Sequence, residues 1–124
     1  PAADEEGYVR DLQLCPGGSA ANTIVGLSRL GVSTAYIGKV GSDEEGRVLL
    51  TDLHNERVDT RCVVRAKGRS GSAMIFVDED GNRAILVDPG VNDTLSYEEI
   101  CRPLLMRASV TAVGPALMSA RWVR

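Results

Sequence analysis

The chain has 124 residues, of which 44% are hydrophobic and 25% charged, as in an ordinary soluble globular domain. This length allows one domain with a modest core, and an aromatic content of 4% means that Val, Leu, Ile and Ala must build it. The formal net charge of −3 is spread over interspersed acidic and basic residues, so no basic block favours a nucleic-acid partner. No apolar run reaches membrane-spanning length, which argues against a membrane partner.

The 3 cysteines, Cys15, Cys62 and Cys101, are widely spaced and include no Cys-x-x-Cys pair. This spacing is a poor match to a zinc site, so we expect three reduced thiols and no metal ligands. The acidic residues 4–6 have the wrong charge for a secretory signal. We therefore expect a cytoplasmic protein.

The first half of the chain predicts a helix, a strand and a second helix. Residues 1–14 show no strong pattern, residues 20–30 have helical apolar spacing and end at Gly31, and residues 34–40 are rich in strand formers. Ser42 and Glu45 have capping-box spacing and predict a helix that ends near Glu56. The side chains expected to face inward from that helix are Val48, Leu49 and Leu53.

The second half predicts strands, a hairpin and one further helix. Short strands are expected at residues 63–64, 72–78 and 83–87, and the last two are joined by an Asp-Gly turn typical of hairpins. Ser96 and Glu99 repeat the capping-box spacing, although Pro103 must kink or delay the helix that follows. A last strand is expected at residues 110–113. The order predicts a parallel α/β core with an antiparallel appendage.

The most informative stretch is residues 15–23, which read CPGGSAANT and lead into the first helix. Gly17, Gly18 and two alanines remove side chains from a helix entrance, so a ligand can approach the backbone there. The amide of Asn22, one turn into the helix, can both donate to and accept from hydroxyl groups, which suits a small polyol. Two alternatives stay open: the glycines serve only close packing, and Asn22 is an ordinary helix residue. A dinucleotide site is a poorer option, because no G-x-G-x-x-G occurs and no strand clearly precedes Gly17.

Other polar residues have a structural interpretation beside a functional one. His54 is the sole histidine and is expected at the surface. Cys15 has no adjacent positive group that would activate its thiol. Arg69 and Arg83 could reach a phosphate, but solvated arginines are the simpler expectation. Asp88 and Asp93 flank a Pro-Gly turn, where turn formation and helix capping compete with a catalytic pair.

Several motifs, in order, resemble those of the pfkB carbohydrate kinases, also called the ribokinase-like family. The resemblance covers roughly residues 15–100. Its first block, GGSAAN at residues 17–22, is specific, and the later blocks gain weight from their order. They are GLSRLGV at 26–32, YIGKVGSDEEG at 36–46, GRSGSA at 68–73, FVDEDGNR at 76–83 and PGVND at 89–93.

The resemblance implies a doubly wound, mostly parallel sheet with flanking helices and a small β-lid, here at about residues 59–88 of a single region 1–124. It also implies ATP-dependent phosphorylation of a hydroxyl on a sugar or nucleoside, with ATP and Mg²⁺ as cofactors of the full-length family. By position, Gly17, Gly18 and Asn22 look like substrate contacts. Ser72 and Ala73 look like lid residues near the substrate.

The family's catalytic segments have no counterpart here. The sequence contains no Gly-Ala-Gly-Asp turn, which carries the family's catalytic base, and no Asn-x-x-Glu motif associated with magnesium. Asp11 is the nearest but unconvincing match to the family's sugar-binding Asp. We therefore assign no catalytic residue and no metal ligand, and expect a substrate-binding N-terminal portion that is inactive alone.

The end of the sequence favours an interpretation as a truncated gene product or a shifted reading frame over a natural compact ending. Apolar residues close to Arg124 include Leu117, Met118, Trp122 and Val123. An interrupted sheet exposes an edge and an apolar face, so we expect a homodimer or another association through the sheet edge or the lid. The alternative function is a non-catalytic structural or dimerisation module derived from the same fold.

Overall fold

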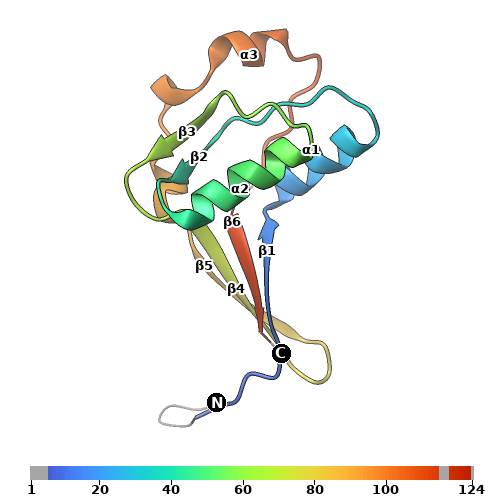
Figure 1. The fold of residues 1–124 in the computed structure, drawn as a ribbon, viewed down its shortest axis with the longest axis vertical. Coiled ribbons are helices and arrows are strands. Elements are labelled where there is room, and N and C mark those ends of the chain that lie inside the picture. The colour runs from blue at the N-terminus through green and yellow to red at the C-terminus, as the bar shows by residue number, and fades with distance from the viewer. Residues whose placement is uncertain (1–5, 115–117, 124) are drawn as a thin grey trace.

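The computed structural model describes residues 6–114 and the backbone of residues 118–123. Helices α1 and α2 and the strands β2 and β3 form a body, from which a second, longer sheet projects (Figure 1). In chain order the elements are β1 (Leu12–Gly17), α1 (Ser19–Arg29), β2 (Gly38–Gly41), α2 (Glu44–Asn55), β3 (Val63–Ala66), β4 (Gly71–Val77), β5 (Arg83–Asp88), the 3₁₀ turns η1 (Gly90–Thr94) and η2 (Tyr97–Glu99), α3 (Arg102–Arg107) and β6 (Met118–Val123).

The body is a small parallel α/β unit. Strands β2 and β3 pair in parallel, and α2 is the crossover between them. All four residues of β2 are buried, and Val40 has no exposed surface. The core is aliphatic apart from one tyrosine, in line with the composition; its buried members are Ala21, Tyr36, Val40, Leu49, Leu53 and Val58.

The projecting sheet has the strand order β1-β6-β4-β5. Strand β6 lies antiparallel to β1 and parallel to β4, while β4 and β5 form the predicted antiparallel hairpin. Asp78 organises the hairpin turn, because its carboxylate accepts hydrogen bonds from the backbone N–H groups of Asp80 and Asn82. Within the segment expected as lid strands, β4 and β5 lie in the projecting sheet, whereas β3 pairs with β2 in the body.

The two long helices begin and end close to the predicted positions, with two corrections. Asp43, not Ser42, is the N-cap of α2, and its carboxylate accepts a 2.9 Å hydrogen bond from the N–H of Gly46. Leu49 and Leu53 are buried as expected, but Val48 is 42% exposed. Val48 therefore lies at the edge of the apolar stripe, where helical geometry turns it toward solvent.

Three strand predictions need correction. Residues 12–17 form β1, although no strand was expected before Gly18, because β6 supplies pairing partners from the other end of the chain. The strand expected over residues 34–40 is confined to Gly38–Gly41, with only an isolated bridge from Ala35 to Asp59. Residues 110–113 form no strand and are exposed. Leu117 lies outside the described residues, as do the side chains of β6.

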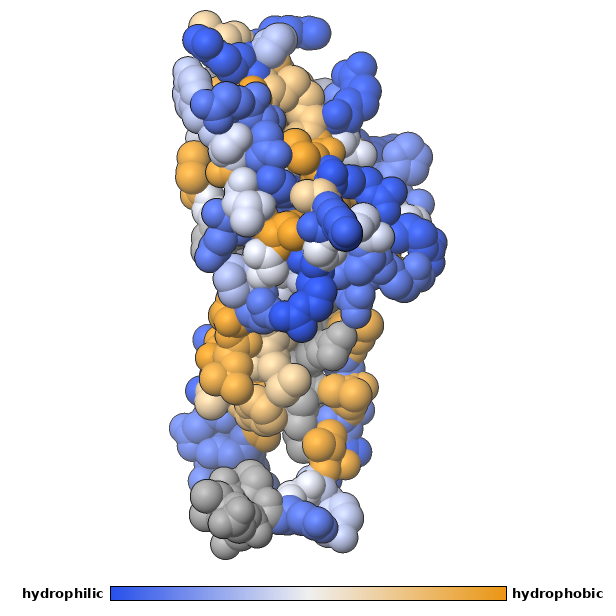
Figure 2. All heavy atoms as spheres, turned by 90° about the vertical axis from the view of Figure 1, so that its left-hand side faces the viewer, coloured by the Kyte–Doolittle hydropathy of each residue, from blue (hydrophilic) through white to orange (hydrophobic). Residues whose placement is uncertain are grey.

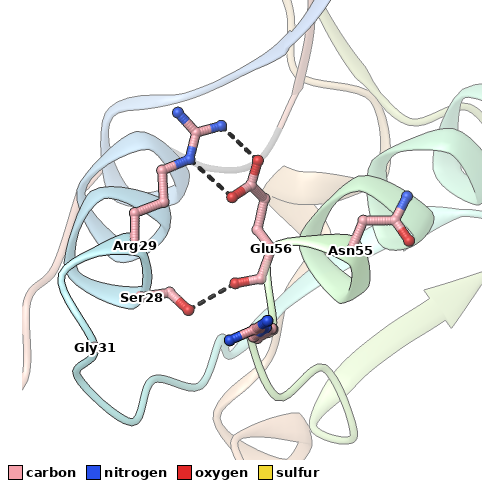
Figure 3. Close-up of a pocket in the computed structure, with 6 residues that line it drawn as sticks. Ser28, Arg29, Gly31, Asn55 and Glu56 are labelled. Carbon is pink, nitrogen blue, oxygen red and sulfur yellow. Dashed lines mark hydrogen bonds and ion pairs between the residues drawn. The ribbon is translucent and has the colours of Figure 1, made fainter.

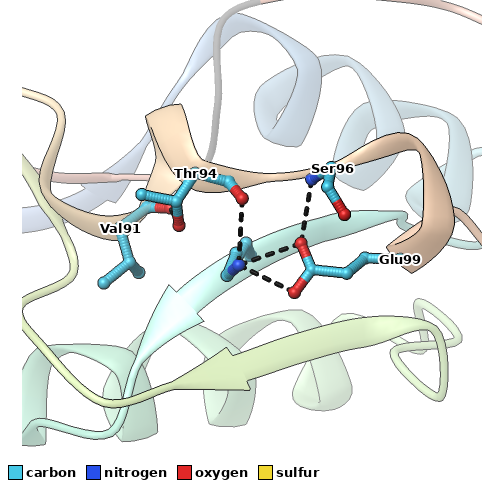
Figure 4. A network of polar contacts seen from close by, with 5 residues as sticks. Val91, Thr94, Ser96 and Glu99 are labelled. Carbon is cyan, nitrogen blue, oxygen red and sulfur yellow. Dashed lines mark hydrogen bonds and ion pairs between the residues drawn. The ribbon is translucent and has the colours of Figure 1, made fainter.

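The predicted capping box at Ser96 and Glu99 is confirmed, but it caps the short turn η2 and not a long helix. Helix α3 starts later, with Pro103 in its first turn. Glu99 also binds Lys39 of β2, whose ammonium Nζ lies 2.7 and 2.9 Å from the two carboxylate oxygens (Figure 4). The carbonyl oxygen of Thr94 accepts a third hydrogen bond from the same ammonium. This contact ties the segment after the hairpin to the body.

The expectation of three reduced thiols is wrong for two of them. Cys62, next to β3, and Cys101, the N-cap of α3, form a disulfide with a Cα–Cα distance of 5.7 Å. Cys15 remains a free cysteine and is half-buried. Spacing along the chain gives no guide to a pairing across 39 residues, which depends on how β3 and α3 pack.

Candidate functional site

The entrance of α1 carries little side-chain bulk, and Gly114 lies against it: a Cβ at Gly114 would come within 2.9 Å of the Ser19 hydroxyl oxygen and 3.5 Å of the Ala20 nitrogen. Gly17 is buried at the end of β1, and Gly18, the N-cap, has φ 105° and ψ 133°, a conformation that a side chain makes unfavourable. No side-chain hydrogen bond caps this helix. The N–H groups of its first turn therefore face the entrance without an intrahelical acceptor, as at every helix start.

Asn22 lies one turn into α1, and its N–H donates to the carbonyl oxygen of Gly18 at 2.9 Å. The residue is exposed, so its side-chain amide is accessible to a ligand. Thr23, the next residue, directs its hydroxyl to the carbonyl oxygen of Ser19. The side-chain amide of Asn22 offers both a donor and an acceptor to a neutral hydroxylated molecule.

The sheet register places β4 beside this entrance. Gly17 pairs with Met118 of β6, and Met118 pairs with Gly71 of β4. Two strand spacings, about 10 Å, therefore separate Gly17 from the start of β4. Ser72 and Ala73 follow at once, Ser72 half-buried and Ala73 6% exposed. Because successive side chains in a strand point to opposite faces, only one of these two side chains can meet a ligand on a given face.

The charged residues near this end of the sheet are mutually paired. The guanidinium of Arg69 lies 2.6 Å from the carboxylate of Asp88, and both side chains are partly solvated. Asp88 also accepts a hydrogen bond from the N–H of Gly90, so it has the turn-forming role expected from the sequence.

A separate hollow of about 270 Å³ lies at the opposite, C-terminal ends of α1 and α2 (Figure 3). Arg29 binds the carboxylate of Glu56 with two hydrogen bonds, and the hydroxyl of Ser28 donates to the backbone carbonyl oxygen of Glu56. The hydrogen bond from Arg29 lowers the pKa of Glu56. These contacts join the carbonyl ends of two helices, so we interpret the hollow as structural. His54, at the end of α2, is exposed as predicted.

In the part of the chain that the structure describes, no three or more His, Cys, Asp or Glu side chains are grouped so that they could hold a metal ion. Among the described residues, no helix combines the length and apolar character needed to cross a membrane.

Sequence reasoning missed one polar contact close to the site, between Asp43 and Ser70 at the start of β4. The carboxylate of Asp43 accepts hydrogen bonds from both the N–H and the hydroxyl of Ser70, each 2.7 Å long. An Asp directly before a helix is itself an N-cap signal, but nothing local indicates a partner 27 residues away.

Known proteins that are similar to this chain in sequence include several sugar kinases. The domain of the pfkB family of carbohydrate kinases matches residues 2–114. An uncharacterized sugar kinase of Archaeoglobus fulgidus is 75% identical over 76 residues, which cover 61% of this chain and 30% of the relative. An ATP-dependent ribose-1-phosphate kinase of Halopiger xanaduensis is 38% identical over 101 residues, covering 81% of this chain and 34% of the relative.

The fold agrees with this match. The crystal structure of an uncharacterized sugar kinase from Pyrococcus horikoshii superposes with a TM-score of 0.72 at 33% identity, covering 85% of this chain and 36% of the other. The same Pyrococcus kinase is known in complex with ATP. The chain thus spans about a third of the length of its relatives and has a partial ribokinase-like α/β fold. By sequence and by structure, the chain belongs to the pfkB family of carbohydrate kinases.

Proposed function

We propose that this chain is the substrate-binding portion of an ATP-dependent sugar or nucleoside kinase. Its substrate contacts are Gly17, Gly18 and Asn22 at the entrance of α1, together with Ser72 and Ala73 on β4, of which one contributes its side chain and the other its backbone. The observation that carries the proposal is the helix entrance without bulky side chains, where Gly18 has a positive φ and the exposed residue Asn22 follows one turn later. Neutral hydrogen-bonding groups of this kind recognise hydroxyl groups.

Phosphoryl transfer to the bound hydroxyl requires a base and a cradle for the phosphate charge. The sequence lacks the Gly-Ala-Gly-Asp segment that supplies both in this family. The chain by itself is therefore expected to bind substrate without turning it over, and ATP and Mg²⁺ belong to the complete enzyme. We place that enzyme in the cytoplasm, where ATP is available.

Binding is tested by thermal unfolding of the chain with a pentose, a hexose, ribose 1-phosphate and a nucleoside. A ligand present at 100 times its Kd stabilises the fold by about 2.7 kcal/mol. We expect one of these ligands to raise the Tm, Asn22→Ala to remove the rise, and Asn55→Ala, an exposed amide at the far end of α2, to retain it. An equal rise in both variants would contradict a role for Asn22, and no rise with any ligand would contradict the proposal.

The alternative, a dimerisation module, is favoured by the apolar face of the projecting sheet (Figure 2). Leu14, Met74 and Leu86 lie in one cross-strand row, with Arg121 of β6 between Leu14 and Met74. The exposed fractions of the three apolar residues are 61%, 38% and 65%. A second copy could cover them, which would also provide the homodimer expected from the sequence. Sedimentation separates the two functions. Two results together would favour the dimerisation module over the kinase portion. The chain would form a dimer that Leu86→Glu dissociates, and none of the four ligands would change its Tm.

A further inference from the structure

The chain enters and leaves the β4–β5 hairpin at a single tight crossing. The N–H of Val91 donates to the carbonyl oxygen of Arg69 at 2.9 Å, so the segment after β5 lies on the segment before β4. Gly90 has φ 55°, and a Cβ there would collide with that same carbonyl oxygen. A Cβ at Gly71 would collide with the side-chain amide of Asn92. The base of the hairpin therefore leaves no room for side chains.

Asp43, which belongs to the body, forms hydrogen bonds with Ser70 at this crossing. One carboxylate oxygen, Oδ2, accepts from the N–H of Ser70 at 2.7 Å. The other, Oδ1, accepts from the hydroxyl of Ser70 at 2.7 Å and from the N–H of Gly46 at 2.9 Å. The Ser70 hydroxyl in turn accepts from the N–H of Gly41 at 2.9 Å. A single carboxylate thus caps α2 and holds the residue that precedes β4.

Close packing keeps this contact from shifting. Ser70 is 5% exposed. A Cβ at Gly46 would collide with the carbonyl oxygen of Gly41, and a Cβ at Gly41 would collide with the backbone of residues 68–70. Burial raises the pKa of Asp43, but the hydrogen bonds from Ser70 and Gly46 outweigh it and leave the pKa below its usual value. The carboxylate is therefore ionised near neutral pH, as a group that only accepts hydrogen bonds must be.

We propose that Asp43 is a positioning residue: it fixes the direction in which the β4–β5 hairpin leaves the body, and so places Ser72 and Ala73 relative to the entrance of α1. Asp43 acts through Ser70 and does not touch the substrate. The consequence for ligand binding rests on the proposed function, whereas the consequence for the hairpin direction does not.

Asp43→Asn separates the two tasks of this carboxylate. Asparagine is as good an N-cap as aspartate, so its oxygen can still accept from the N–H of Gly46. Its NH₂ group, however, would face the N–H of Ser70, and two donors cannot bond. Asp59→Asn is the matched control, because Asp59 is also half-buried and its side chain bonds to Arg61, away from the hairpin base. Ser70→Ala removes the other partner and serves if Asp43→Asn does not fold.

The measurement is the spread of distances between spin labels at position 80, in the hairpin turn, and position 54, at the end of α2. Each label is attached to an introduced cysteine, with Cys15→Ser and the disulfide left intact. We expect Asp43→Asn and Ser70→Ala to broaden the distribution at least twofold, and Asp59→Asn to leave it unchanged. An unchanged width of the distance distribution in both Asp43→Asn and Ser70→Ala would overturn the proposal, and so would an equal broadening in Asp59→Asn.

The affinity for whichever sugar stabilises the unmodified chain gives the second measurement. Asp43→Asn is expected to weaken it about tenfold or more, because fewer molecules hold Ser72 and Ala73 in place. A broadened distance distribution with unchanged affinity would remove these β4 residues from the site and leave the positioning of the hairpin intact. The two proposals therefore fail in different ways.

Discussion

The ion pair between Lys39 and Glu99 predicts an asymmetry in stability. The side chain of Lys39 is 8% exposed, whereas that of Glu99 is 28% exposed. Replacing Glu99 with glutamine leaves an enclosed ammonium with neutral acceptors only. Replacing Lys39 with methionine leaves a carboxylate that water reaches and that still accepts from the N–H of Ser96. The buried cation is therefore the costlier group to leave without its partner.

The expected magnitudes follow from this exposure. Removing one partner of a buried ion pair costs about 3–5 kcal/mol. Glu99→Gln retains one acceptor, so it should destabilise by about 3 kcal/mol. Lys39→Met should destabilise by only about 1 kcal/mol, because methionine fills the volume of the lysine stem and Glu99 is hydrated.

Urea denaturation followed by circular dichroism measures both changes. With a slope of about 1.5 kcal/mol/M, the two midpoints should differ by about 1.3 M, with Glu99→Gln the lower. The double variant should lose less stability than the sum of the single losses, since neither charge then remains alone. A loss for Lys39→Met that equals or exceeds the loss for Glu99→Gln would refute the reasoning.

Three further predictions concern the backbone, pH and the disulfide. Gly46→Ala should lower the urea midpoint, because the new Cβ collides with the backbone carbonyl oxygen of Gly41. Gly26→Ala, with open space around it in α1, should instead raise the free energy of unfolding by about 0.5–1 kcal/mol. A loss of stability in both variants would refute the packing argument. Because the pKa of Asp43 is lowered in the folded state, its carboxylate contributes its full stabilisation above pH about 4 and loses it as the pH falls through the folded-state pKa. Asp43→Asn should therefore flatten the acid limb of a plot of stability against pH, and an unaltered limb would contradict this. Reducing Cys62–Cys101, which closes a loop of 39 residues, should cost up to about 4 kcal/mol in thermal unfolding. An intact mass that shows three free thiols in the unreduced chain, where the disulfide leaves only that of Cys15, would contradict the link.

Local signals predicted the helices and the hairpin well. Apolar spacing placed α1 and α2 to within about a residue or two, because an amphipathic stripe depends on neighbours three and four positions apart. The turn at residues 78–82 depends on Asp78 and Gly81, which are only three positions apart in the chain. The capping box at Ser96 was likewise identified from two residues. Helix α3 begins only at Arg102, which places Pro103 in its first turn.

Long-range pairing accounts for what the sequence could not predict. Strand β1 exists because β6 lies beside it, whereas residues 110–113 form no strand although their valines and threonine favour one. Ser42 and Asp43 both fit an N-cap, and the choice follows from contacts of Asp43 with Ser70, which is 27 residues away. The proposed substrate residues show the same division: Gly17, Gly18 and Asn22 form a local motif, while the neighbourhood of Ser72 depends on the register through β6.

Backbone amide NMR of the chain during a sugar titration tests the central claim most directly. The sugar should be the ligand that gives the largest rise in Tm. Amides of Gly17, Gly18, Asn22, Ser72 and Ala73 should shift together and saturate with one Kd, since they are proposed to line one site. Shifts confined to the hollow between the ends of α1 and α2, or an absence of saturable shifts at both glycines, would contradict the claim that the α1 entrance binds the substrate.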